Sequence, residues 1–361
     1  MKILVHICCS VDSHFFLQKL QKDYPNAKFI GFFYDPNIHP YSEYYLRLLD
    51  VKRSCDMLGI ELIEGEYDYI NWLNAVRGLE NEPEKGSRCS VCFDRRFEVS
   101  AKRAQELGCE FFTSTLLTSP KKSIKQLQSS GESLAKRYKT KFITVDYRSN
   151  SGTQEQNILA KKDKLYRQNY CGCMFGLKMQ REAQDKLLDE LFCPINKQIL
   201  PNSIEDKIEL YKKRLELEEK GINYEIVKQR FLNWRLMQGL VKTKQTILPS
   251  HILPYSKLNR GYSRGKVEKV VNSIHFFNRD EIKFITLQTY NELLNTNYRD
   301  IFELILNPPK FKTEVALREK LLNSSYDLSA IVVLNQIPTS KLEIKIDSKI
   351  YEDVKETLFI L

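Results

Sequence analysis

The sequence lacks any apolar run that approaches the roughly 18 residues needed to span a membrane. Its N-terminus, MKILVHICCS, has a short apolar stretch that is interrupted by His6, and it has no small-residue cleavage site. We therefore interpret it as a first strand and not as a signal peptide. Glycine and proline are also scarce, at 14 and 12 residues of 361, which excludes a collagenous or low-complexity chain. These absences predict a soluble, cytoplasmic protein.

The chain is long enough for two domains, and 42% of its residues are hydrophobic, enough for two cores. The segment CPINKQILPNS (193–203) contains two prolines and several polar residues, as a linker does. We expect a first domain over residues 1–190 and a second over 191–361. The net charge of +10 suits a partner that carries phosphates, and a solvated basic surface is the alternative.

Nine cysteines are an odd number for a disulfide framework, and nothing in the sequence directs the chain out of the cell. Six of them form three tight groups, and we call them the grouped cysteines: Cys8, Cys9, Cys89, Cys92, Cys171 and Cys173. The other three, Cys55, Cys109 and Cys193, each lie in or beside an apolar run and are interpreted as core residues. No cysteine follows Cys193, so the first half of the chain is the one expected to carry chemistry.

The first half alternates apolar, β-prone segments with segments of helical spacing, which predicts a parallel α/β sheet. Ligands bind such sheets at the carboxyl ends of the strands. Cys8 and Cys9 end the first expected strand, and Asp35 follows the second. We therefore expect a site at one edge of the sheet. The expected strands are 2–9, 27–37, 61–66, 109–117 and 141–147, and the expected helices are 11–22, 42–58, 69–79, 93–107 and 122–138.

Three kinds of site are compatible with the grouped cysteines. A structural zinc site is closed by four ligands, which six cysteines exceed. An iron–sulfur cluster takes up to four thiolates and leaves other thiols for a second metal. The third alternative is that the cysteines are small buried apolar side chains. Three groups at one edge of the sheet favour metal ligation.

Local spacing supports this interpretation. A C-x-x-C turn at 89–92 lets both sulfurs face one site, and its amides are expected to lower the thiolate pKa. Arg88, Arg95 and Arg96 flank this pair and would stabilise thiolates or a negatively charged cluster. Gly172 in C-G-C indicates a positive φ or a close approach of the backbone.

Four motifs occur in a fixed order: CCSVD (8–12), FYDPNIHP (33–40) with Glu43, Tyr44 and Arg47 behind it, RCxxCFxxR (88–96) and YRQxYCGC (166–173). Together they resemble the QueH family of epoxyqueuosine reductases, and the resemblance covers residues 1–180. It implies the last step of queuosine synthesis, in which epoxyqueuosine at the wobble position of tRNA loses its epoxide oxygen. The resemblance also implies a [4Fe-4S] cluster, a further mononuclear iron and an unidentified electron donor.

The resemblance assigns candidate roles to individual residues. The grouped cysteines and Asp12 would hold the metals, without a division between the two metals. Candidates for proton supply or substrate positioning are Asp12, Tyr34, Asp35, Tyr166 and Arg167, and for all of these except Asp12 a turn or exposed polar residue is the alternative. For Asp12 the alternative is a helix N-cap.

The segment SVDSHFF resembles the S-G-G-x-D-S loop of PP-loop ATP pyrophosphatases and follows the first strand, as in that fold. It lacks both glycines, which hinders close approach of a pyrophosphate. We therefore expect an adenine-nucleotide α-hydrolase-like (PP-loop-like) first domain without ATP use. The alternative functions are a PP-loop-related iron–sulfur tRNA thiolase and a zinc-stabilised RNA-binding module.

The second domain is expected to be mixed but mostly helical, with a helix at 204–220 and β-like stretches at 328–335 and 341–346. Between Lys242 and Lys269 it has seven Lys or Arg against one Glu. We call four of these the basic set: Lys257, Arg260, Arg264 and Lys266. We expect the basic set to bind tRNA phosphates, with His251, Tyr255 and Tyr262 stacking on unpaired bases. A solvated basic face is the alternative.

Overall fold

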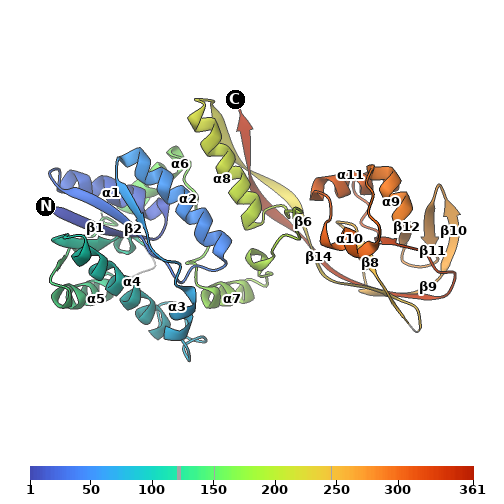
Figure 1. The fold of residues 1–361 in the computed structure, drawn as a ribbon, viewed down its shortest axis with the longest axis horizontal. Helices are drawn as coiled ribbons and strands as arrows, with labels where there is room; N and C mark the ends of the chain where they lie inside the picture. The colour runs from blue at the N-terminus through green and yellow to red at the C-terminus, as the bar shows by residue number, and fades with distance from the viewer. Residues whose placement is uncertain (120–122, 150, 245) are drawn as a thin grey trace. The chain divides into compact units, whose positions relative to one another are not determined.

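The computed structural model describes residues 1–119, 123–149, 151–244 and 246–361. The chain divides into two compact units, Met1–Leu191 and Phe192–Leu361, which are described separately (Figure 1). No helix in the described ranges is both long and apolar enough to cross a membrane.

The first unit is built on a five-stranded sheet with the order β3-β2-β1-β4-β5, in which every neighbouring pair is parallel. This confirms the parallel α/β prediction for the first half. The strands are β1 (Lys2–Ile7), β2 (Lys28–Phe33), β3 (Glu61–Glu64), β4 (Phe111–Ser114) and β5 (Lys141–Phe142). The fifth strand is shorter than expected, because its pairing with β4 ends at Phe142.

Helices cover both faces of this sheet, so its central strand is buried from Ile3 to Ile7 (Figure 1). Ile3, Val5 and Ile7 pack in the core that includes helix α1 (Ser10–Asp23) and helix α2 (Tyr41–Leu58). Leu4 points the other way, into the core with Ala101 of α4 (Ser87–Glu106). The period of two along β1 therefore joins the sheet to a helical layer on each side.

The remaining helices of this unit are α3 (Tyr69–Ala75), α5 (Ile124–Arg137), α6 (Gly152–Lys162) and α7 (Met174–Ala183). The sequence predicted α1 to α5 but neither α6 nor α7. Helix α4 begins at Ser87, not at residue 93, so the C-x-x-C pair lies in its first two turns. The expected start of the fifth helix at residue 122 lies outside the described residues.

The chain runs from β1 outward through β2 to β3 on one side of the sheet and from β4 to β5 on the other. The order of the strands therefore changes direction between β1 and β4, which pair with each other. In doubly wound sheets this switch point opens a crevice at the carboxyl ends of the strands. Cys8 follows β1, and Thr115 follows β4 in the 3-10 helix Thr115–Thr118. The Cys8 Sγ and Thr115 Oγ1 atoms lie 3.8 Å apart. The expected gathering of residues at one sheet edge is therefore present.

The second unit contains nine strands and four α-helices in its described ranges, so the expectation of a mostly helical domain is wrong. Two strands of 19 residues pair antiparallel along their length, β6 (Tyr224–Lys242) and β14 (Leu342–Ile360). The shorter strands are β7 (Ile247–Leu248), β8 (Ser250–Ile252), β9 (Tyr262–Gly265), β10 (Val267–Val271), β11 (Ile274–Phe277), β12 (Lys283–Thr286) and β13 (Ile331–Leu334). All nine strands form two sheets, with the strand orders β7-β6-β14-β9 and β10-β11-β12-β13-β8.

The helices of this unit are α8 (Ile204–Glu219), α9 (Leu287–Leu294), α10 (Ile301–Leu306) and α11 (Phe311–Leu322). Helix α8 coincides with the predicted helix at 204–220, and β13 lies within the predicted β-like stretch at 328–335. The apolar core between the two sheets includes Val241, Phe284 and Ile344.

Candidate functional site

Five of the six grouped cysteines line one pocket in the first unit: Cys8, Cys89, Cys92, Cys171 and Cys173. The sixth, Cys9, is buried beside it, with its Sγ 4.0 Å from the Sγ of Cys8. The three cysteine groups come from the end of β1, the start of α4 and the segment before α7. The pocket has a volume of about 80 Å³.

The first group sits where β1 turns into α1. Cys9 is the residue that caps the N-terminus of α1, and Asp12 lies in its first turn. Ligand atoms of Cys8, Cys9 and Asp12 all lie within 4.8 Å of one another, which is close enough for one metal ion. Asp12 is therefore not the N-cap. Its Oδ1 accepts a hydrogen bond of 2.6 Å from Gln156 of α6.

Hydrogen bonds and burial both shift the pKa values of these three groups. The contact with Cys9 lowers the pKa of the Cys8 thiol and raises that of the Cys9 thiol, and burial adds to the rise at Cys9. Burial raises the pKa of the Asp12 carboxyl, and the hydrogen bond from Gln156 opposes this rise. Without a cation, this corner of the pocket is a poor place for three negative charges.

The C-x-x-C pair is helical, so its two side chains share one face of α4 at a spacing of three residues. The amide of Lys85 donates to the Cys89 Sγ at 3.3 Å. Burial raises the pKa of Cys92, although the positive charge of Arg96 opposes this rise. The expected lowering of the thiolate pKa by the turn is therefore not found at Cys92.

Three buried nitrogens that line the pocket have no hydrogen-bond partner among the described residues: Nε1 of Trp72, Nε of Arg88 and Nε of Arg96. Arg96 is paired with the fully buried carboxylate of Asp35. N–H donors of this kind suit an anionic group held by thiolates. The donor set therefore fits a metal–sulfur centre better than a set of neutral thiols packed as core.

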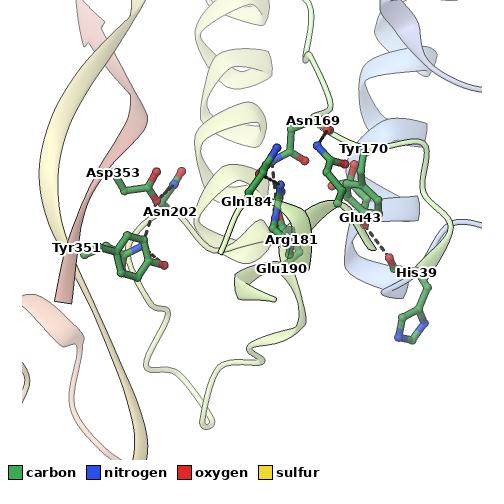
Figure 2. A network of polar contacts seen from close by, with 12 residues as sticks. His39, Glu43, Asn169, Tyr170, Arg181, Gln184, Glu190, Asn202, Tyr351 and Asp353 are labelled. Carbon is green, nitrogen blue, oxygen red and sulfur yellow. Dashed lines mark hydrogen bonds and ion pairs between the residues drawn. The ribbon is translucent and has the colours of Figure 1, made fainter. Parts of the chain in front are cut away.

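Backbone contacts hold the Cys171–Cys173 segment in place. Arg47 of α2 donates to the carbonyl oxygens of Tyr170 at 3.0 Å and Cys171 at 3.3 Å, and Glu43 fixes the same guanidinium at 2.7 Å. The Tyr170 hydroxyl donates to the carbonyl oxygen of His39 at 2.6 Å (Figure 2).

Next to this segment, a second contact network ties Asn169 to the end of α7. Asn169 donates to Glu190 at 3.1 Å, and Glu190 is also paired with Arg181 of α7 (Figure 2). The segment that carries Cys171 and Cys173 is thus held on one side by the buried pair of Arg47 with Glu43 and on the other by the partly buried pair of Arg181 with Glu190.

Gly172 within this segment has φ +104°, as its C-G-C context predicted. A Cβ at this position would lie 2.7 Å from Cγ1 and 3.2 Å from Cα of Ile38. The close approach is therefore to the loop after β2.

The other four candidate residues, Tyr34, Asp35, Tyr166 and Arg167, lie outside the lining of the cysteine pocket. Asp35 is buried behind Arg96, and burial raises the pKa of its carboxyl to about 6 while Arg96 opposes this. Tyr34 is buried and donates to Asp68 at 3.1 Å, and Tyr166 donates to Glu43 at 2.9 Å. Arg167 is exposed and donates to Asn157 at 2.6 Å. None of these four is among the described residues that line the pocket.

Several pocket residues received no role from the sequence: Asn37, Trp72, Leu116, Ser119 and Gln168. Asn37 and Gln168 lie inside the quoted motifs, which is the signal that could have found them. Trp72 has no such signal, because its placement depends on how α3 docks.

Cysteines outside the groups behave as two kinds. Cys55 and Cys109 are buried in the two cores of the sheet, as predicted. Cys193 is exposed, so its assignment to the core is wrong. The reason is that it lies in the second unit just after the boundary at Leu191.

In the second unit, all four residues of the basic set are exposed, and Arg264 lies 3.5 Å from Glu343. His251 is held by Glu314 at 2.5 Å, and the Tyr255 hydroxyl donates to Leu232 at 2.8 Å. Among the three expected stacking residues only Tyr262 is classed as exposed, at 48%.

The family model described as Epoxyqueuosine reductase QueH matches residues 3–179 of the chain. A protein named Epoxyqueuosine reductase QueH from Helicobacter pylori is 40% identical to the chain, and the match covers 97% of this chain and 98% of that protein. A protein of the same name from Histophilus somni is 36% identical over 49% of this chain and 72% of its own length. Among solved structures, the chain is similar to the U34-tRNA thiolase NcsA from Methanococcus maripaludis with its [4Fe-4S] cluster, with TM-score 0.35, 18% identity, and coverage of 60% of this chain and 73% of that chain.

Proposed function

The chain belongs to the epoxyqueuosine reductase QueH family, and we propose on this basis that it reduces epoxyqueuosine in the anticodon of tRNA to queuosine. The observation that carries the proposal is the convergence of five grouped cysteines and three buried arginines, Arg47, Arg88 and Arg96, on one pocket at the switch point of a parallel sheet. We also propose that this sheet has the PP-loop-like architecture.

The reaction removes the epoxide oxygen as water and leaves a carbon–carbon double bond. It consumes two electrons and two protons, and the electrons come from an external reductant. No amino-acid side chain supplies electrons of this kind, so a metal centre is required. An iron–sulfur cluster held by the cysteines would supply electrons singly, and an iron with an open position held beside it would supply Lewis-acid chemistry.

We propose that Cys89, Cys92, Cys171 and Cys173 hold a [4Fe-4S] cluster, and that Cys8, Cys9 and Asp12 hold a further iron. Two observations support this division. The second set has its ligand atoms within 4.8 Å of one another, and the first set supplies the four thiols that a cluster needs. The unpartnered nitrogens of Trp72, Arg88 and Arg96 are then the donors to the sulfur ligands.

The remaining candidates act mainly as positioning residues in this proposal. Asp35 fixes Arg96, and Tyr166 fixes Glu43, whose partner Arg47 holds the carbonyl of Cys171. Tyr34 donates a hydrogen bond to Asp68. Arg167 is exposed, and its positive charge opposes the rise that burial causes in the pKa of Asp12, so we place it near Asp12 as a contact for a substrate phosphate. Asp12 is the one carboxyl among them that lines the pocket.

The basic set of the second unit is proposed to contact tRNA phosphates. Exposure of all four side chains supports this proposal, and the ion pair of Arg264 with Glu343 reduces what that residue can contribute. His251 and Tyr255 have no part in this proposal, because both are only partly exposed and held by internal contacts.

The function is tested by incubating anaerobically reconstituted protein with tRNA that contains epoxyqueuosine and a chemical reductant, followed by mass spectrometry of the nucleosides. We expect a product lighter by one oxygen and a broad iron–sulfur absorption of the protein. The same reaction with ATP and a sulfur donor serves as the control for the thiolase alternative. A sulfur-containing product, or no product with a fully loaded protein, would contradict the proposal.

A further inference from the structure

Four aromatic side chains follow β2 and β3 at the carboxyl edge of the sheet, and we call them the aromatic rim: His39, Tyr41, Tyr67 and Tyr69. Their rings form a continuous series. The Tyr41 and Tyr67 ring centroids are 5.0 Å apart, those of Tyr67 and Tyr69 are 6.0 Å apart, and those of His39 and Tyr69 are 4.9 Å apart. Tyr67 and Tyr69 are nearly parallel, at an interplanar angle of 9°.

The aromatic rim is joined to the cysteine pocket. The Tyr69 ring centroid lies 5.8 Å from that of Trp72, which lines the pocket. The backbone of His39 is tied to the cysteine segment, since its amide donates to the Gly172 carbonyl at 2.9 Å. Burial and the neighbouring Cys173 raise the pKa of Tyr69. The series of rings therefore extends from the pocket wall to Tyr41.

Core packing does not account for the outer part of the aromatic rim. Tyr41 is 55% exposed, and Ile70, which follows Tyr69, is 67% exposed. Trp72, at the inner end of the series, is fully buried. A large apolar surface that continues from a pocket into solvent is typical of a binding surface.

The size of the pocket decides what must lie outside it. Its volume of about 80 Å³ is below the roughly 150 Å³ of a cavity that accepts a benzene molecule. The metal centre proposed above would take up part of this space, so a nucleoside does not fit and only part of the reacting ring can reach in from outside. The base that carries this ring, and its neighbours in the strand, must be held at the surface.

We propose that the aromatic rim, with Tyr41 as its exposed face and the half-buried His39, Tyr67 and Tyr69 as its support, is a stacking surface for an unpaired base of an RNA loop next to the nucleotide whose side group enters the cysteine pocket. Unpaired bases are commonly bound by stacking on Tyr, His and other aromatic side chains. This inference rests on the proposed function for the presence of an RNA substrate. The aromatic rim would make a different type of RNA contact from the basic set. Affinity from base stacking depends little on salt, whereas affinity from phosphate contacts depends on it strongly.

The test measures binding of a 17-nucleotide anticodon stem-loop without epoxyqueuosine (a probe size on the order of one loop plus a short stem, chosen because loops are the single-stranded targets of such surfaces). Binding to this probe does not require turnover, so failure of the reductase reaction and failure of the stacking surface are seen separately. The variants are Tyr41→Ala in the reconstituted full chain, Tyr41→Phe as the conservative rescue, and Tyr326→Ala as the matched control. Tyr326 is 91% exposed and lies in the second unit.

We expect Tyr41→Ala to weaken binding about five- to tenfold, the lower range for loss of one base–aromatic stack. The slope of affinity against salt and the iron content should stay at wild-type values, and Tyr41→Phe should restore affinity. A wild-type chain that does not bind the probe, equal affinity of Tyr41→Ala, or a changed salt slope would each overturn the proposal. Loss of iron in Tyr41→Ala would assign the aromatic rim to support of the metal pocket and would overturn it as well.

Discussion

Gly172→Ala tests how the cysteine segment is fitted to the loop after β2. The substitution adds one methyl group at a position with φ +104°, in the segment between Cys171 and Cys173. The new Cβ would lie 2.7 Å from Cγ1 of Ile38 and 3.2 Å from its Cα. The side chain can shift, but Ile38 is buried in the loop between β2 and α2, so its backbone has little room to move.

The magnitude follows from two separate costs. An alanine at this φ costs about 1–3 kcal/mol of backbone strain, and the overlap with Ile38 adds about 1–3 kcal/mol of overpacking. The sum, about 2–6 kcal/mol, is a large part of the roughly 5–15 kcal/mol by which a domain is stable. We expect the segment to move outward instead of the sheet unfolding, which displaces both neighbouring thiols.

The assay compares urea unfolding of the metal-free full chain with bound iron after anaerobic reconstitution. Gly59→Ala is the matched control, because Gly59 has φ +66° but nothing lies within 4 Å of the position that its new methyl group would take. It should lose only about 1–2 kcal/mol of stability and keep its iron. If Gly172→Ala unfolds at the same urea concentration as Gly59→Ala and retains full iron, the steric argument is wrong.

Other side chains of the site and of the basic set allow four further tests. Serine in place of any one grouped cysteine should lower bound iron and abolish turnover, whereas Cys193→Ser should change neither; full activity of two grouped variants would refute the ligand set. Asp12→Asn should lose iron or rate with stability unchanged within about 1 kcal/mol, and normal turnover would leave Asp12 only a first-turn helix residue. Arg96→Met leaves the carboxyl of Asp35 buried without its cation. In urea unfolding, this variant should lose about 3–5 kcal/mol of stability at pH 7.5. The loss of stability should be smaller at pH 5, because the pKa of the Asp35 carboxyl is already raised to about 6 in the folded protein and protonation removes the buried charge. Equal losses of stability at both pH values would contradict this. Replacing the whole basic set by alanine should weaken tRNA binding and flatten its salt slope by up to about 3, with iron unchanged, and an unchanged slope would remove the basic set from the interface.

The sheet and its edge could be predicted because their signals are local. The segment 2–9 is apolar and is followed by polar residues, as expected for a buried strand that ends in a turn. Parallel pairing of β1 with β4 is then enough to bring Cys8 next to Thr115. Gly172 was predictable for the same reason, since a glycine between two site residues has few other uses. The grouping of cysteines in the sequence corresponded to their grouping in space.

Other features depended on tertiary docking that the sequence does not display. The strand β14 extends from Leu342 to Ile360, beyond the predicted 341–346, because it pairs with β6, a strand separated from it by most of the second unit. Much of this ribbon is solvated, so its apolar alternation is weak. Likewise, Tyr34 and Asp35 are neighbours after β2, yet Tyr34 turns to Asp68 and Asp35 to Arg96. The sequence could not separate their directions.

The order in which the ribosome releases the chain gives the Cys171–Cys173 segment a further consequence. Four of the grouped cysteines emerge early, with β1 and α4, but the segment that completes the pocket follows all five strands of the sheet. Arg47 has been synthesised long before Tyr170 and Cys171, whose carbonyl oxygens accept its hydrogen bonds. Its charge is compensated during this interval by Glu43, four residues earlier in the chain. Under the proposed ligand set, iron that arrives before residue 173 has left the ribosome meets only part of its ligands. The proposed metal site is therefore complete only once Cys173 has been synthesised, and the second unit contributes none of the grouped cysteines.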